Sequence, residues 1–213
     1  MNKHLENLKK IKQEKMIAAY QKHGMELVFV EDRTDLYAHL SHLFKDQKTV
    51  CLGGSQTLFE TRVIDFIKAS DVKLYDRYEE GLSSDEIAEI FRKQFTSDLF
   101  VTSTNAMTVD GYLYNIDYTG NRVAAMIYGP KEVIIVVGEN KIFESEASAI
   151  EHIRHVACPA NCMRLNRNTP CVKVGHCVDC ESRDRLCSSY VKMGYQREKG
   201  RIKIFVVPGS YGY

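Results

Sequence analysis

Four cysteines toward the C-terminal end are spaced closely enough to bind one metal ion. Cys171, Cys177, Cys180 and Cys187 fall within seventeen residues, and two residues separate the central pair. That separation lets two thiolates converge on one ion, and both zinc and iron–sulfur clusters accept four thiolates. The sequence therefore predicts a metal site with these four ligands and leaves the choice between zinc and an iron–sulfur cluster open.

Basic residues around these cysteines support the thiolate form. Lys173, Arg183 and Arg185 lie among them, and nearby positive charge favours a thiolate over a thiol. The spacing matches neither the double pair of a zinc ribbon nor the ferredoxin run. The alternative is a cysteine-rich loop without metal, either reduced or forming a redox-labile bridge. His176 could replace one thiol, although a solvated loop histidine is the simpler interpretation.

A predicted helix nearby carries three residues that are candidates for a second metal site. His152, His155 and Cys158 recur at three-residue steps, which places them on one helical face. An ordinary surface face explains the same pattern, so we treat this site as the weaker hypothesis.

The polar stretch "TSTNAMTVDGYLYNIDYTGNRVAAM", residues 102–126, is a second candidate site. It lies between two runs that are typical of buried strands, 98–101 and 132–138. Thr104 and Asn105 lie three and four residues after the first run and supply hydroxyl and amide groups without bulk. We therefore expect this stretch to line a ligand cleft, the alternative being a surface loop.

Charged residues of the same stretch are candidates for catalysis and for binding. Asp110 and Asp117 are general-base candidates, because proton abstraction next to a carbonyl needs a positioned carboxylate; Asp110 could equally serve only a tight turn. Asn121 and Arg122 begin a predicted helix, and Arg122 could bind a carboxylate or phosphate through two parallel hydrogen bonds. Replacing Arg122 by Ala should then weaken anion binding about tenfold or more.

The segment "CLGGSQT" joins a predicted strand to a helix through two glycines. Gly53 and Gly54 let the backbone approach a ligand, and Ser55 begins a helix whose first amides favour an anion. The segment is neither a phosphate-binding loop nor a dinucleotide fingerprint, so no nucleotide cofactor motif is present. A tight turn with Ser55 as helix cap is the structural alternative.

Alternating strands and helices must position these residues. Buried runs predict strands, and 3.6-residue periods between them predict helices, including one over 55–70 and one over 144–157. Such alternation predicts a three-layer α/β/α fold with a mostly parallel sheet. We expect one domain over 1–213, interrupted by a cysteine-rich insertion at 158–200. The predicted strands are 25–30, 49–54, 72–76, 98–103, 111–117, 132–138 and 201–207.

Composition excludes several classes of protein. The 213 residues include 29 basic and 28 acidic residues, a net charge of +1, which gives no electrostatic argument for nucleic-acid binding. No apolar run approaches the ~20 residues of a membrane span, and the polar first residues do not form a signal peptide. Seven cysteines, an odd number, argue against a disulfide scaffold. A cytoplasmic location is therefore expected.

Several of these segments together resemble the lactate-utilisation (LUD) domain family. They are "TSTNAMTVDGYLYNIDYTGNRVAAMIYGPKEVIIVVGENKI", "CLGGSQT", "RHVACPANCMRL" and "TPCVKVGHCVDCESRDRLC". The resemblance covers nearly the whole chain after the first helix. It implies a fold like that of phosphosugar isomerases, CoA transferases and formyltetrahydrofolate cyclo-ligases. Cys158 and Cys162 stand where it leads us to expect small residues, so it assigns them no role.

The resemblance leaves two kinds of function open. One is an enzyme or enzyme subunit for lactate or a related small carboxylate, with an anion-binding cleft at the carboxyl edge of the sheet. The other is a non-catalytic subunit that carries zinc or an iron–sulfur cluster and docks with iron–sulfur oxidoreductase subunits. Neither the substrate nor a homo-oligomeric state follows from the sequence.

Overall fold

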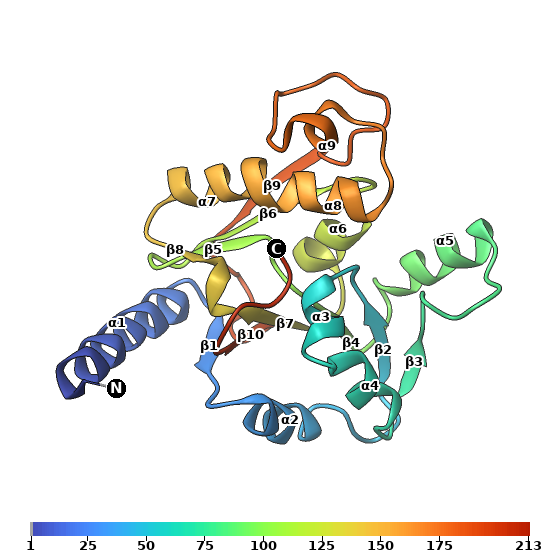
Figure 1. Cartoon of the computed structure of the whole chain (residues 1–213). Helices are drawn as coiled ribbons and strands as arrows, with labels where there is room; N and C mark the ends of the chain where they lie inside the picture. The colour runs from blue at the N-terminus through green and yellow to red at the C-terminus, as the bar shows by residue number, and fades with distance from the viewer. Residues whose placement is uncertain (1) are drawn as a thin grey trace.

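A six-stranded parallel sheet forms the centre of the molecule (Figure 1). The computed structural model describes residues 2–213. All five neighbouring strand pairs are parallel, as the alternating sequence pattern predicts. In spatial order the strands are β1 (Glu26–Phe29), β10 (Ile202–Val207), β7 (Glu132–Gly138), β4 (Leu99–Thr102), β2 (Thr49–Leu52) and β3 (Lys73–Tyr75).

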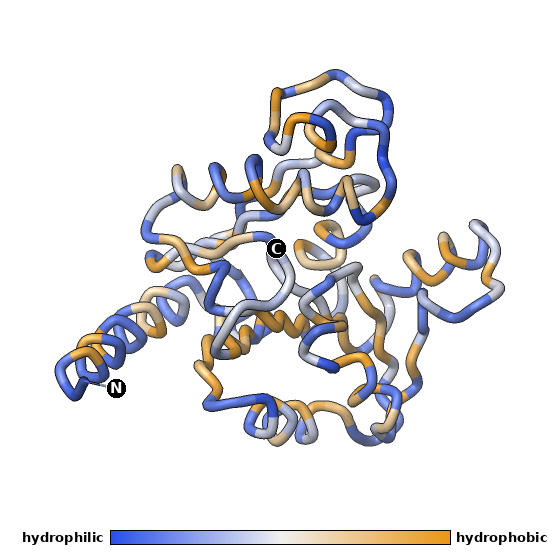
Figure 2. Tube along the Cα trace, in the orientation of Figure 1, coloured by the Kyte–Doolittle hydropathy of each residue, from blue (hydrophilic) through white to orange (hydrophobic). Residues whose placement is uncertain are grey.

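Both faces of this sheet are buried, and β7 shows how. Ile134 and Val136 of β7 belong to one apolar cluster, with α2 (Arg33–Ser41), α3 (Gln56–Glu60) and α4 (Val63–Lys68). The alternate residues of β7 belong to the other cluster, with α1 (Lys3–Lys22) and α6 (Asn121–Tyr128). A strand that is buried on both faces has a nearly continuous apolar sequence. Figure 2 shows apolar residues along the central strands. The predicted α/β class is confirmed.

A second, four-stranded sheet was not predicted. Its order is β8 (Ile142–Phe143), β5 (Ala106–Thr108), β6 (Leu113–Asp117) and β9 (Ser189–Met193). The polar stretch thus supplies β5 and β6, which are antiparallel to each other and lie outside the main sheet. Met107 and Leu113 pack toward the main core, while Ala106 and Tyr114 pack against a helix on the other side.

One long helical run covers this second sheet. It consists of α7 (Glu146–His152), a π-helical turn η2 (Ile153–Ala157) and α8 (Cys158–Arg164). Pro159 sits in the first turn of α8, so the run passes the proline at which the periodic pattern of the sequence stops. The segment that we predict to be an insertion, residues 158–200, also contains α9 (Pro170–Val174) and β9. Within residues 2–213, no helix is both long and apolar enough to cross a membrane.

The helix predicted over 55–70 is broken into α3 and α4. Arg62, between them, has a left-handed backbone with φ of 55°. In a continuous helix the carbonyl of Thr61 would accept a backbone hydrogen bond. Here it accepts one from the Tyr37 hydroxyl at 2.8 Å. Because α3 has only five residues, its dipole attracts an anion at Ser55 less strongly than the predicted longer helix would. The remaining elements are α5 (Ser84–Lys93) and the short 3-10 turn η1 (Glu139–Lys141).

Candidate functional site

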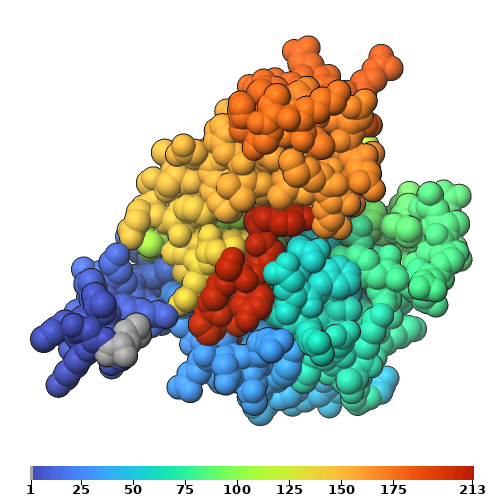
Figure 3. Space-filling model, viewed as in Figure 1, coloured from blue at the N-terminus to red at the C-terminus, as the bar shows by residue number. Residues whose placement is uncertain are grey.

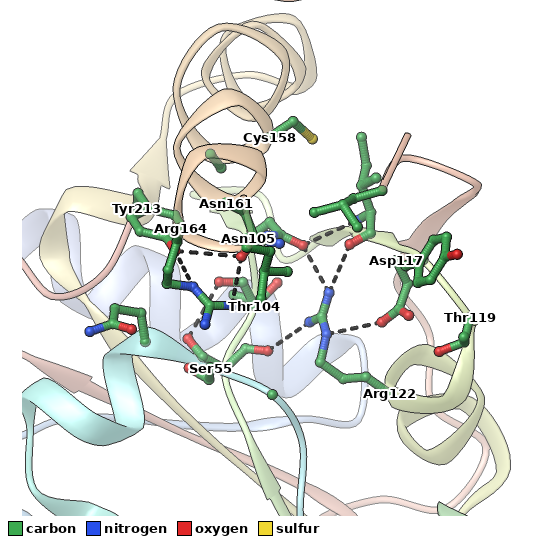
Figure 4. A pocket seen from close by; sticks show the side chains of 18 of the residues that line it. Ser55, Thr104, Asn105, Asp117, Thr119, Arg122, Cys158, Asn161, Arg164 and Tyr213 are labelled. Carbon is green, nitrogen blue, oxygen red and sulfur yellow. Dashed lines mark hydrogen bonds and ion pairs between the residues drawn. The ribbon is translucent and has the colours of Figure 1, made fainter. Parts of the chain in front are cut away.

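A cavity of about 370 Å³ lies at the carboxyl ends of the main strands (Figure 4). The turns that follow β2, β3, β4 and β7 each contribute residues, as do the turn after β6, helix α8 and Tyr213. Ligands of parallel α/β proteins bind at this edge, since loops from neighbouring strands meet there.

Most residues expected from the sequence do meet in this cavity. Two do not: Gly53 and Asp110 are absent from its lining. Gly53 is instead packed so tightly that an added Cβ would lie 2.4 Å from the Thr102 hydroxyl. Asp110 is exposed in the turn between β5 and β6. The residues that line the cavity as expected are Gly54, Ser55, Thr104, Asn105, Asp117, Asn121 and Arg122.

Arg122 is held by the protein itself. Its Nε donates to Asp117 at 3.1 Å, one terminal nitrogen donates to Ser103 O and Asn115 Oδ1, and the other donates to Asn105 Oδ1 and Ile116 O. These contacts use all five N–H donors of a guanidinium group. Burial lowers the pKa of Arg122, and the Asp117 carboxylate opposes that shift. The structure therefore gives Arg122 a positioning role: it fixes three segments that form the cavity wall (Figure 4).

Among residues 2–213, two residues of the cavity lining each carry a buried N–H group without a protein partner. The two groups are Nδ2 of Asn121 and Nε of Arg167. Asn121 Oδ1 is occupied, because it accepts from the Thr119 hydroxyl at 2.6 Å, so the amide nitrogen is the free end. Buried donors without a partner are uncommon and are satisfied by water or by a ligand.

Positive charge dominates the cavity lining. Asp117 is its single acidic residue in the part of the chain that the structure describes, and this carboxylate is paired with Arg122. Arg77 covers the glycine turn: its guanidinium lies within 3.4 Å of where a Cβ on Gly54 would stand. The basic residues of the lining are Arg77, Arg122, Lys141, Arg164 and Arg167.

Lys141 is a buried amine that sequence reasoning missed. Its side chain follows β7 through η1, and its Nζ donates to Thr57 Oγ1 at 2.8 Å. Burial lowers the pKa of Lys141 to about 8; the charge of Arg122 adds to this shift and Glu60 opposes it. Arg77 and Arg164 were missed as well. A single signal was available for Lys141 and Arg77: each follows a predicted strand by three residues or fewer.

The C-terminal segment, residues 208–213, closes one side of the cavity. In Figure 3 it lies in a furrow between η1 and α3. Thr57 Oγ1 donates to the carbonyl of Tyr211 at 3.0 Å, and Asn140 exchanges hydrogen bonds with Tyr211 and Gly212. The hydroxyl of Tyr213 accepts from Arg164 Nε at 2.7 Å and so fixes this arginine on α8. The last residues are therefore part of the cavity wall.

The pKa values of several cysteines depend on their neighbours. Burial, followed by the charge of Cys171, raises the pKa of the Cys162 thiol. Cys177 raises the pKa of Arg154. The hydrogen bond from Cys158 and the nearby guanidinium of Arg185 lower the pKa of Cys187, while the pKa of Cys158 is raised by the same contact and by burial.

Metal binding stays a prediction. Within residues 2–213, no three side chains of His, Cys, Asp or Glu are arranged to hold a metal ion. In the weaker candidate site on the helix, two histidines pack against other rings. The ring centroids of His152 and Phe143 are 4.8 Å apart, and those of His155 and His176 are 6.1 Å apart. Metal analysis of protein purified without oxygen is the direct test of the predicted four-thiolate site.

Comparison with known proteins places the chain in a family. No curated protein matches its sequence. A crystal structure of a DUF162 family protein from Deinococcus radiodurans is similar in fold, with a TM-score of 0.52. That similarity covers 93% of this chain and 96% of the other, at 14% sequence identity. The LUD domain matches residues 13–207, and the chain therefore belongs to the LUD domain family.

Proposed function

We propose that the cavity binds a small organic anion and that the protein acts in the utilisation of lactate or a related small carboxylate. The observation that carries this proposal is the charge of the lining: five basic residues face one acidic residue, which is already neutralised. Family membership supports the choice of a small carboxylate as the substrate class.

Two unpartnered donors are the contacts we propose for the anion. Asn121 and Arg167 both line the cavity, and Nδ2 of the first and Nε of the second have no protein partner among the described residues, so we expect a bound anion to accept hydrogen bonds from them. A hydrogen bond to a charged group contributes about 1.5–3 kcal/mol, or roughly tenfold or more in affinity. A volume of about 370 Å³ lies within the range of small-molecule sites.

Lys141 is the group we propose for proton transfer if the bound anion is also transformed. A lysine with a pKa of about 8 exchanges its proton near physiological pH. Asp117, the sequence-based candidate, is engaged by Arg122 and by the Gly120 amide, which suits a carboxylate that holds the site together. Asp110 lies away from the cavity lining, so we leave it out of this proposal.

Calorimetric titration with L-lactate and with inorganic phosphate tests the binding site. Arg167→Gln and Asn121→Ala should each weaken binding about tenfold. Arg197→Gln is the matched control, because Arg197 is exposed and outside the cavity lining. Equal affinities for the wild type, Arg167→Gln and Arg197→Gln would contradict the proposal.

A further inference from the structure

Lys141 brings a primary amine into the wall of the cavity. The residue belongs to η1, directly after β7, and lines the cavity with only 4% of its surface exposed. Its hydrogen-bond partner is a neutral hydroxyl, since Nζ donates to Thr57 Oγ1 at 2.8 Å. Among the ion pairs of residues 2–213, none includes Lys141. The amine is therefore buried at a cavity without a carboxylate partner.

These surroundings favour the neutral form of the amine. A buried ammonium group without a paired carboxylate is costly, so burial shifts a lysine toward its uncharged state. The Glu60 carboxylate, close by, accepts from the Gly212 amide at 2.6 Å. Burial, with the charge of Arg122, accordingly lowers the pKa of Lys141 to about 8. At pH 7 roughly a tenth of the molecules then carry a neutral amine, against less than about one in a thousand for an exposed lysine.

The hydrogen bonds around Thr57 leave the lone pair of this amine available. The Thr57 hydroxyl donates its single proton to the carbonyl of Tyr211 at 3.0 Å, so it can only accept from Lys141. A Cβ on Gly212 would lie 3.2 Å from Nζ, which places the C-terminal segment directly beside the amine. Residues 208–213 thus orient the amine, through Thr57, as a donor whose lone pair is not used by the hydroxyl.

The same cavity offers donors for a carboxylate. In the function proposed above, Asn121 and Arg167 hold the anion. A 2-oxo acid carries a ketone next to its carboxylate and, unlike a hydroxy acid, offers an amine a carbon to attack. Neutral lysine amines in desolvated sites are the nucleophiles that form imines with carbonyl compounds.

We propose that Lys141 forms an imine with a small 2-oxo acid, an inference that rests on the proposed anion binding for the carboxylate. The lone pair of the neutral amine attacks the ketone carbon, the electrons of the C=O double bond move to the oxygen, and one amine proton follows, which gives a carbinolamine. The hydroxyl then leaves as water with the second proton of the nitrogen, and the C=N double bond forms. One amine and one ketone become one imine and one water, without oxidation or reduction.

Reductive trapping of the full-length chain tests the proposal. The protein is incubated with pyruvate and sodium cyanoborohydride at neutral pH, and intact protein and peptides are analysed by mass spectrometry. The wild type should gain one carboxyethyl group on Lys141, at least about tenfold faster than on exposed lysines. Lys141→Met should lose this label. Lys199→Met is the matched control and should keep it, because Lys199 is exposed and outside the cavity lining.

The wild-type chain unfolded in urea is the second control. There Lys141 should react no faster than Lys199, since the preference depends on the folded cavity. The position of the label in the folded wild type decides the test even if Lys141→Met fails to fold. Labelling spread evenly over exposed lysines, or absent from Lys141, would overturn the imine.

Arg167→Gln separates this inference from the proposed function. Slower labelling of Lys141 in this variant, by about tenfold at low pyruvate concentration, supports both. Labelling of Lys141 at the wild-type rate supports the imine and counts against the anion site. Lactate binding that depends on Arg167, with no label on Lys141, leaves the anion site standing and overturns the imine alone.

Discussion

Arg122 illustrates how a single residue can take a role that its type alone does not reveal. An arginine in the first turn of a helix is a reasonable ligand for a substrate anion. Here the guanidinium points inward and holds Asp117, Asn105 and two backbone carbonyls of the cavity wall. The positive charge still contributes to the cavity's potential, but its hydrogen bonds maintain the shape of the site.

Removal of this side chain should therefore affect the fold as well as binding. Arg122→Met leaves the Asp117 carboxylate buried without its partner, and loss of one member of a buried pair costs about 3–5 kcal/mol. Urea unfolding should show a decrease of that size in the free energy of unfolding. Arg197→Met, at an exposed position, should change it by less than about 0.5 kcal/mol. Equal stabilities of the two variants would contradict the positioning role.

Lys141 should make stability depend on pH in an identifiable window. Its pKa is about 8 in the folded protein against an ordinary value of 10.5. Between these values the unfolded chain binds more protons than the folded one, so the free energy of unfolding rises with pH. Relative to Lys141→Met, the wild type should gain about 1–3 kcal/mol across this window.

Urea titrations of both proteins from about pH 6 to about pH 10.5 measure this difference. A unit or more below its folded-state pKa of about 8, Lys141 is protonated in both states, so the difference between the two proteins should be flat there. A difference that is flat over the whole range would mean that Lys141 titrates as an ordinary exposed lysine.

At the scale of elements, the two glycines after β2 have separate tasks. A Cβ on Gly53 would meet the Thr102 hydroxyl at 2.4 Å and the Phe100 ring at 2.9 Å. A Cβ on Gly54 meets only the Arg77 side chain, at 3.4 Å. Gly53 therefore permits the close packing of β2 on β4, and Gly54 provides the place for the Arg77 cation.

Alanine substitutions should separate these tasks. Gly53→Ala should lower the free energy of unfolding by about 1–3 kcal/mol, since strand residues must move. Gly54→Ala should stay within about 0.5 kcal/mol of the wild type and leave phosphate binding nearly unchanged, because its Cβ would make only an ordinary contact with Arg77. Arg77→Gln, which removes the cation itself, should weaken phosphate binding about tenfold. Urea unfolding and calorimetry measure the two effects. An Arg77→Gln variant with unchanged phosphate affinity would remove Arg77 from the binding site.

The elements that the sequence predicts well are those buried on both faces. The run 132–138 is apolar throughout and appears as β7. The second sheet escaped prediction because β8 has only two residues and β9 pairs with β6 from far along the chain. The basic lining of the cavity escaped for a similar reason: Arg77 and Arg164 are distant in sequence, and only the spatial order of the strands brings them together.

The whole molecule depends on one late strand. β10 lies between β1 and β7 and pairs with both. A chain that ends at Gly200 lacks β10, so β1, at the edge of the sheet, loses the strand with which it pairs. We expect this shortened chain to show no cooperative thermal unfolding. The control, a chain that ends at Pro208, keeps β10 and should unfold cooperatively. A cooperative transition of the shorter chain near the wild-type temperature would contradict this dependence.

The position of β10 also affects how the protein is made. β1 ends at Phe29, whereas its partner begins at Ile202. Ribosomes add about 5–20 residues per second, so β1 waits on the order of ten to thirty seconds for β10. During that time one edge of the growing sheet has no strand to pair with, and an unpaired edge invites other chains. Slower translation would lengthen this exposure, and a nascent-chain chaperone that covers β1 would protect the protein.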